Sequence, residues 1–132
     1  MLTALQVRNY VLIDSLEIDF PEGLIIITGQ TGAGKSILLG ALGLVMGSKA
    51  DSSMVSEGAD NCVVEAEFET SDMSIRDVLE ENEAEWEDGH LTIRRVVNRS
   101  GRSRAFVNDC PVSVTVLQDI ASRLVDIHSQ HQ

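Results

Sequence analysis

A cluster of glycines beside a lysine and a serine is the part of this sequence best suited to chemistry. The segment TGQTGAGKSILLG spans residues 28–40, and within it Gly29, Gly34, Lys35 and Ser36 follow the spacing GxxxxGK[ST]. Glycines let successive backbone N–H groups point at phosphate oxygens. A lysine adds a mobile cation for the β- and γ-phosphates, and a serine hydroxyl is a hard oxygen ligand suited to Mg²⁺. The spacing therefore predicts a P-loop that binds a nucleoside phosphate.

The segments on either side of the glycines have the composition that a P-loop requires. Residues 24–27 form a short apolar run rich in isoleucine, which predicts a strand buried on both faces. Residues 36–46 are apolar on nearly all sides, so we expect a helix buried deep in the domain, with Gly47 as its C-cap. A helix beginning at Ser36 would direct its positive end at the phosphates.

The rest of the chain predicts more strands than helices. Residues 2–7 and 16–20 read as strands before the P-loop, and residues 48–60 as a surface loop. In residues 61–70, apolar residues alternate with glutamates, which predicts a half-exposed strand. Its expected inward side chains are Cys62, Val64, Ala66 and Phe68, and its outward ones are Glu65, Glu67 and Glu69.

Two helices and a hairpin complete the expected elements. Ser74 and Asp77 have the spacing of a capping box, opening a short helix with Ile75, Val78 and Leu79 inward. Residues 91–98 and 104–108 predict a hairpin around the turn 99–102. A last helix follows from the spacing of Leu117, Ile120, Ala121, Leu124 and Val125.

Composition limits the function classes. The chain has 132 residues and a net charge of −11, which suits one acidic domain. No apolar run approaches the roughly 20 residues of a membrane span, and the N-terminus lacks a signal-peptide layout. Cys62 and Cys110 are expected to be reduced thiols of a cytoplasmic protein. The six acids in residues 80–88 are expected to be a solvated helix end and loop.

Half of the basic residues gather in one place. Five of the ten lysines and arginines lie within residues 94–104, so a local basic patch on an acidic body is a candidate contact for DNA. The alternative is a solvated or internally paired arm. The candidate DNA-contacting residues are Arg99, Arg102 and Arg104.

Other motifs of nucleotide-binding enzymes are missing from the chain. No D-x-x-G or N-K-x-D follows the P-loop, which argues against guanine recognition. Residues 10–14, YVLID, have the form of a Walker B motif, but they precede the P-loop and are expected to be the end of a hairpin. The sequence therefore supplies a phosphate cradle without a Walker B aspartate.

The order of these pieces resembles the ATP-binding-cassette heads of the SMC-like family and, more closely, a bacterial DNA-repair branch of that family. The matching segments are NYVLIDSLEIDF, GLIIITGQTGAGKSILLGALGLVMG, VVEAEF, IRRVVNRSGRSRAFVND and LVDIHSQHQ. The resemblance implies an α/β P-loop NTPase fold: an ABC-ATPase-type N-terminal lobe with a mixed or antiparallel β portion beside the P-loop strand and helix. Residues 1–132 would be a single partial domain, with the coiled coil and the C-terminal lobe absent.

The resemblance also implies a function and its site. The complete protein would be a cytoplasmic, nucleoid-associated ATPase in recombinational repair of DNA double-strand breaks, with two heads self-associating around ATP. This lobe alone, without the C-terminal lobe of the same chain, would be inactive. Lys35 and Gln130 would be catalytic, and Ser36 and Gln130 would bind Mg²⁺. The residues expected to bind ATP are Gly29, Gln30, Thr31, Gly32, Ala33, Gly34, Lys35, Ser36 and Ile37.

Three questions stay open from the sequence. An ABC transporter subunit shares the P-loop lobe, although the segments DIHSQHQ and SGRSRAFVND argue against it. A small-molecule kinase would need a late catalytic aspartate, and none is evident. The adenine contacts follow no motif, and the first hairpin near residues 8–10 is the candidate place for them.

Overall fold

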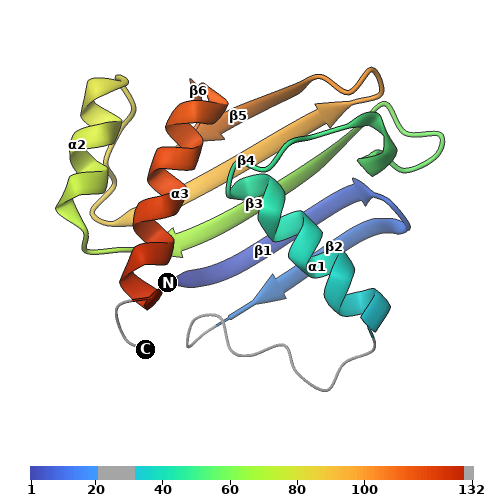
Figure 1. The fold of residues 1–132 in the computed structure, drawn as a ribbon, viewed down its shortest axis with the longest axis horizontal. Helices are drawn as coiled ribbons and strands as arrows, with labels where there is room; N and C mark the ends of the chain where they lie inside the picture. The colour runs from blue at the N-terminus through green and yellow to red at the C-terminus, as the bar shows by residue number, and fades with distance from the viewer. Residues whose placement is uncertain (21–31, 130–132) are drawn as a thin grey trace.

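The computed structural model describes the backbone of residues 1–20 and 32–129 and the side chains of residues 1–20 and 37–124. Figure 1 shows a sheet of strands with helices packed against it. The strands are β1 (Leu2–Tyr10), β2 (Ile13–Asp19), β3 (Asn61–Glu69), β4 (His90–Asn98), β5 (Ser103–Val107) and β6 (Cys110–Val112). The helices are α1 (Gly32–Val45), the 3₁₀ turn η1 (Ser52–Met54), α2 (Met73–Glu81) and α3 (Val114–Ser129).

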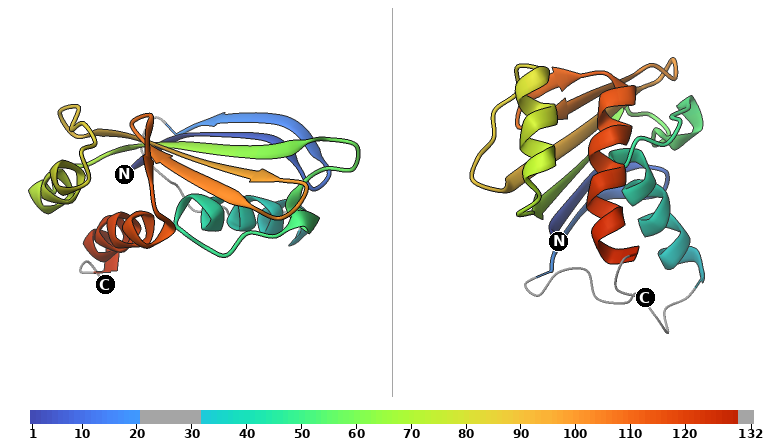
Figure 2. Two further views of the ribbon diagram at one scale, coloured as in Figure 1. Left: turned by 90° about the horizontal axis from the view of Figure 1, so that it is seen from above. Right: turned by 60° about the vertical axis from the view of Figure 1, so that its left-hand side comes forward.

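The described strands form one six-stranded sheet in the order β2-β1-β3-β4-β5-β6, and each neighbouring pair is antiparallel. The antiparallel β portion expected from the sequence is therefore confirmed. The expected P-loop strand at residues 24–27 lies outside the described residues. Helices α1 and α3 cover one face of the sheet, and α2 packs beside α3 at one end (Figure 2).

The two faces of the sheet follow the alternation of the sequence. On β3 the predicted inward set, Cys62, Val64, Ala66 and Phe68, is buried, whereas its glutamates face the other side. Leu91, Ile93 and Val97 of β4 continue the buried face. Because side chains alternate with period two along a strand, this pattern also fixes the register of the pairing.

Helix α1 begins earlier and is less buried than the sequence predicts. It starts at Gly32 rather than Ser36, so the second half of the P-loop motif lies on its first turn. Ala41, Leu44 and Val45 are fully buried against the sheet, whereas Leu39 is 53% exposed. The prediction of a deeply buried helix was wrong for this part of the chain, because α1 packs on the sheet through one face only.

Gly47 ends α1 as expected. Its φ of 99° lies in the left-handed region. The Gly47 N–H donates to the Leu44 carbonyl at 3.1 Å, and the Ser48 N–H donates to the Gly43 carbonyl at 2.9 Å. This pair of bonds is a Schellman motif, which satisfies carbonyls that the helix leaves free at its end.

Two details of the second half differ from the sequence analysis. The N-cap of α2 is Asp72, whose carboxylate accepts from the Ser74 N–H at 2.9 Å, so Ser74 lies in the first turn and the Ser74–Asp77 capping box was wrong. The inward set Ile75, Val78 and Leu79 is confirmed. The short strand β6 was not predicted. It follows a two-residue turn in which Asn108 and Asp109 have φ of 50° and 64°.

Candidate nucleotide-binding site and arginine hairpin

The P-loop motif lies across the N-terminus of α1. Gly29, Gln30, Thr31 and Gln130 lie outside the described residues, so their predicted roles stay predictions. The backbone of Gly32, Ala33, Gly34, Lys35 and Ser36 forms the start of α1. Their side chains lie outside the described part as well. Ile37 is half-buried and packs against the core, which fixes the helix just after the motif.

The start of α1 suits an anion. The first four N–H groups of an α-helix have no partner within the helix, and its dipole is positive there. The first turn of α1 carries no acidic residue that could compete for these groups. The glycines at positions 32 and 34 add no side chain, and the lysine at 35 adds a positive charge. The donor set therefore fits the phosphates of a nucleotide.

Tyr10 does not serve as an exposed ring for adenine. It is 5% exposed and packs against α1, where a Cβ on Gly40 would overlap the Tyr10 hydroxyl. Burial raises the pKa of the Tyr10 phenol. Within the candidate segment 8–10, the buried ring thus positions α1 against β1. Arg8 is exposed and lies near Gln6 and Glu65 on the face of the sheet away from α1.

The Walker B-like segment is a hairpin end, as expected. Tyr10 pairs with Ile13 across the β1–β2 turn. The Val11 N–H donates to the Met54 carbonyl at 2.9 Å, and the Ser56 hydroxyl donates to the Val11 carbonyl at 2.7 Å. These bonds tie the turn to the loop around η1.

The backbone of the β4–β5 turn is held by hydrogen bonds to one asparagine side chain. The Asn98 Oδ1 atom accepts from the Ser100 N–H at 3.0 Å and from the Arg102 N–H at 3.1 Å. Gly101 takes a φ of 88°, which suits glycine. These bonds and the glycine define the shape of the turn next to the candidate DNA contacts. We call residues 98–104 the arginine hairpin.

The five clustered arginines have different surroundings, so the basic patch is smaller than their count suggests. Arg94 lies on the face away from the helices, where it pairs with Asp109 at 3.0 Å and Glu65 at 3.6 Å and lies 4.5 Å from the Phe106 ring centroid. Arg95 points to the opposite face and is buried. Among the side chains described, Arg102 and Arg104 are exposed and form no ion pair.

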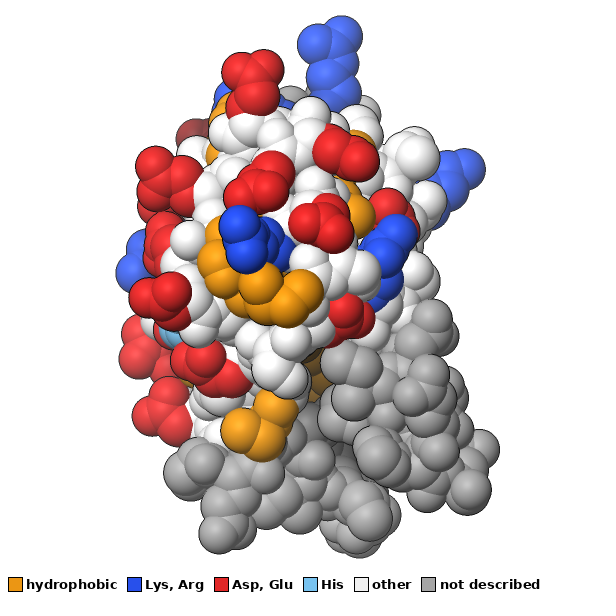
Figure 3. All heavy atoms as spheres, turned by 90° about the vertical axis from the view of Figure 1, so that its left-hand side faces the viewer, with side chains coloured by type: hydrophobic (Ala, Val, Ile, Leu, Met, Phe, Trp, Pro, Cys, Tyr) orange, Lys and Arg blue, Asp and Glu red, His pale blue; other side chains and the backbone are white. Residues whose placement is uncertain are grey.

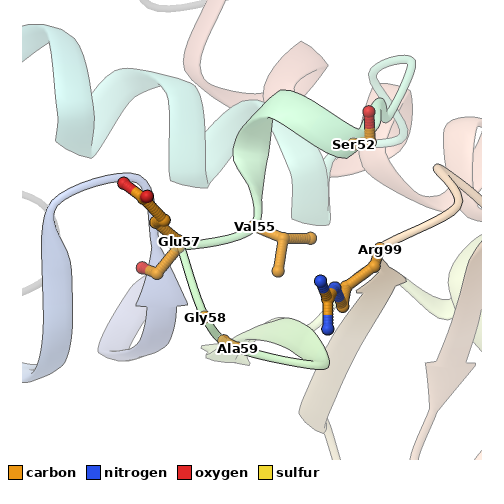
Figure 4. A pocket seen from close by; sticks show the side chains of 7 residues that line it. Ser52, Val55, Glu57, Gly58, Ala59 and Arg99 are labelled. Carbon is orange, nitrogen blue, oxygen red and sulfur yellow. The ribbon is translucent and has the colours of Figure 1, made fainter.

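Arg99 lies beside a shallow hollow between the hairpin and the loop after η1 (Figure 4). The hollow has a volume of about 280 Å³ and is lined by Ser52, Val55, Ser56, Glu57, Gly58, Ala59 and Arg99. The Arg99 guanidinium is 3.7 Å from the Asp60 carboxylate, and its side chain is 66% exposed. An exposed pair of this length is weak, so Arg99 remains able to exchange Asp60 for another anion.

Sequence reasoning missed the inward direction of Arg95. The signal was present, because Leu91, Ile93, Arg95 and Val97 alternate with outward residues along β4. A count of nearby charges placed Arg95 in the surface patch, whereas the period-two pattern of the strand places it in the core.

The described residues carry neither a metal-type cluster nor a membrane-type helix. No group of three or more His, Cys, Asp or Glu side chains within the described part is arranged to hold a metal ion. No helix there is long and apolar enough to cross a membrane.

Comparison with known sequences gives consistent relatives. A family profile described as an AAA domain matches residues 4–130. The protein named DNA repair protein RecN of Vibrio cholerae is 39% identical over 132 residues, and that of Haemophilus influenzae is 40% identical over 134 residues. Each alignment covers 99% of this chain and 24% of the relative. The chain thus spans about a quarter of the length of these relatives.

Solved structures show the same architecture at lower identity. An SMC ATPase, from a study of ATP-driven dimerization and DNA-stimulated activation, has a TM-score of 0.71 at 21% identity and covers 92% of this chain and 77% of its own. The SMC head domain from Thermotoga maritima has a TM-score of 0.63 at 24% identity, covering 89% and 41%. The recombination mediator protein RecF has a TM-score of 0.67 at 21% identity, covering 89% and 29%.

These likenesses agree with the P-loop motif and with the sheet and helices described above. At such identities, the solved structures show a shared fold. The profile match extends over nearly the whole chain. The chain belongs to the AAA-domain family and shares its fold with part of the heads of SMC ATPases.

Proposed function

We propose that this chain is the ATP-binding lobe of a RecN-like ATPase that acts in recombinational repair of DNA double-strand breaks. The start of α1 at Gly32 carries the proposal, because it puts the Gly-Lys-Ser end of the motif on the first helical turn. The similarity to proteins named DNA repair protein RecN supports the biological role.

The proposed roles of the site residues follow from their chemistry. Backbone N–H groups of residues 29–37 would hold the phosphates of ATP, and Lys35 would offset the charge of the β- and γ-phosphates. Ser36 would ligate Mg²⁺, and Gln130 would do so through its amide oxygen while its amide nitrogen donates to water or phosphate. Lys35 and Gln130 are the two candidate catalytic residues of this lobe.

Hydrolysis would need groups from outside the lobe. Phosphoryl transfer requires a held metal, a positioned water and charge stabilisation together. In the proposal, the C-terminal lobe and a second head supply what is missing, and two heads associate around ATP. This lobe alone would bind nucleotide without turnover, and the complete protein would act in the cytoplasm on nucleoid DNA through the arginine hairpin.

Lys35→Ala tests the site directly. Removing the mobile cation of the cradle should abolish tight ATP binding, because β- and γ-phosphate charge would stay uncompensated. Isothermal titration of folded protein with Mg²⁺-ATP measures the loss, and Ser36→Ala should chiefly remove the Mg²⁺ dependence. Arg76→Ala is a matched control, since Arg76 pairs with Glu80 on the exposed side of α2. Unchanged affinity in Lys35→Ala would disprove the P-loop assignment.

A further inference from the structure

The C-terminal turn of α1, residues 44–48, is held by side chains from two other elements. The Arg95 Nη1 atom of β4 donates to the Leu44 carbonyl at 2.8 Å and to the Ser48 carbonyl at 2.9 Å. From α3, the Gln118 Nε2 atom donates to the Gly47 carbonyl at 2.9 Å. The end of α1 away from the P-loop is therefore fixed to β4 and to α3.

Arg95 is a charged residue in the core between β4 and α1, where an apolar side chain would be expected. It is 1% exposed, and no carboxylate of the described residues lies within ion-pair distance. Its Nε atom has no hydrogen-bond partner there. Burial lowers the pKa of its guanidinium. The carbonyls and negative dipole at the end of α1 offset part of the cost of burying this charge. Because apolar side chains often replace buried charges without loss of stability, packing alone is a weak reason for an arginine here.

The same guanidinium also contacts the base of the arginine hairpin. Its Nη2 atom donates to the Ser103 hydroxyl at 2.9 Å. Ser103 lies between Arg102 and Arg104, and it pairs with Val97 across the β4–β5 ladder. One planar side chain thus joins α1 to the first residue of β5, between two of the candidate DNA contacts, Arg102 in the turn and Arg104 on the strand.

We propose that Arg95 is a positioning residue that couples the arginine hairpin to the P-loop helix. DNA bound at the hairpin shifts Ser103, and the guanidinium transmits this shift to residues 44–48. An α-helix rises 1.5 Å per residue, so α1 carries the shift as a rigid rod over about 20 Å to its N-terminal turn. Linkage requires the effect to be reciprocal, so nucleotide also changes DNA affinity by the same factor. The inference rests on the proposed function for both ligands.

The test uses the complete protein and measures how much bound DNA changes the affinity for nucleotide. A non-hydrolysable ATP analogue is titrated with and without a saturating short DNA duplex. In the parent protein, DNA should change the analogue affinity by about fivefold or more. In Arg95→Met, the factor should fall to within about twofold of one, while each ligand alone binds within about threefold of the parent value. Arg95→Lys should lose coupling too, because an ammonium lacks the planar fork that reaches both carbonyls and Ser103. Arg76→Met is the control and should keep the parent factor.

The outcomes separate this inference from the proposed function. Parent coupling retained in folded Arg95→Met overturns the inference, as does binding of both ligands by the parent without coupling. Failure of the parent to bind the analogue overturns the proposed function and the inference together. If Arg95→Met does not fold, Ser103→Ala decides, since it removes only the hairpin contact. Full coupling in Ser103→Ala would then refute the role of Arg95.

Discussion

At the scale of single residues, Asp72 shows how one side chain sets a helix boundary. Its carboxylate accepts from the Ser74 N–H at 2.9 Å and from the Ser74 hydroxyl at 2.7 Å. Asp72→Ala should lower the free energy of unfolding by about 1 kcal/mol, measured by urea denaturation. Asp77→Ala is the control and should cost less than about 0.5 kcal/mol, because Asp77 lies exposed on the next part of the helix. The opposite ranking would restore the Ser74–Asp77 box.

Acid should weaken this cap in a defined direction. The side-chain and backbone hydrogen bonds from Ser74 lower the pKa of the Asp72 carboxyl below its ordinary value of 3.8. The cap therefore stabilises the fold fully above that value, and its contribution is lost as pH falls through the lower pKa of the folded state. The difference in the free energy of unfolding between the parent and Asp72→Ala should therefore shrink at acid pH.

His90 gives the opposite pH dependence. Its Nδ1 atom is 2.9 Å from Glu69 and its Nε2 atom is 3.3 Å from Glu67. The hydrogen bond with Glu69 is the largest cause that raises the pKa of His90 above 6.5. Burial opposes this rise, and the charges of Glu69, Glu67 and Glu87 add to it. The contribution is present below pH 6.5 and is lost as pH rises through the higher folded pKa.

His90→Gln should show this dependence in melting temperature. The difference from the parent should be larger at pH 6 than at pH 8.5, and small in size because the pair is partly exposed and screened. Glu80→Gln, which breaks a pair with Arg76, should give no such difference across the same range. A His90→Gln effect independent of pH would mean that the imidazole acts only by packing.

At the scale of elements, the end of α1 depends on glycine for two reasons. Gly47 has a φ of 99°, and a Cβ there would lie 3.3 Å from the Gln118 Cα atom and overlap its Cγ. Gly58 has a φ of 85°, but a Cβ there would meet no heavy atom within 4 Å. Gly58→Ala should cost about 1 kcal/mol from backbone strain, and Gly47→Ala about 2–4 kcal/mol from strain plus overlap with α3. If urea denaturation gave the same loss of unfolding free energy for both variants, close packing of α3 against Gly47 would not contribute to the cost.

Elements with strong local periodicity were predictable from the sequence. β3 alternates over its whole length, and α3 repeats apolar residues at helical spacing, so each signal is summed over many positions. The candidate site follows from the sequence for a different reason: the P-loop spacing reflects what phosphate requires of a backbone. Its residue roles stay predictions.

What could not be predicted depends on contacts between distant segments. The strand β6 has three residues, one of them proline, and its partner β5 defines it. The burial of Tyr10 depends on Gly40 of α1, and the role of Arg95 depends on carbonyls about fifty positions earlier in the chain. The asparagine and aspartate at 108–109 were a usable turn signal, because such residues tolerate the positive φ of a tight hairpin.

At the scale of the whole molecule, the charges are separated along β4. The acids of residues 80–88 are all exposed at the α2 end of the sheet, which Figure 3 shows with many Asp and Glu side chains. The arginine hairpin follows the other end of β4 (Figure 1). Nine strand residues extend about 30 Å, which exceeds the Debye length of about 8 Å in physiological salt. The acidic end therefore leaves the local field of the hairpin largely intact.

This separation makes DNA binding by an acidic chain testable through its salt dependence. Each phosphate contact releases about 0.9 counterion, so each contact-forming arginine that is removed should reduce the slope of log affinity against log salt by about that amount. Arg99→Gln, Arg102→Gln and Arg104→Gln should each do so in the complete protein, with a DNA duplex as ligand. Arg94→Gln is the matched control, because Asp109, Glu65 and the Phe106 ring already occupy its guanidinium. It should leave the slope unchanged. A triple variant of Arg99, Arg102 and Arg104 with the parent slope would mean that the hairpin is a solvated arm, and that DNA meets the protein through another surface.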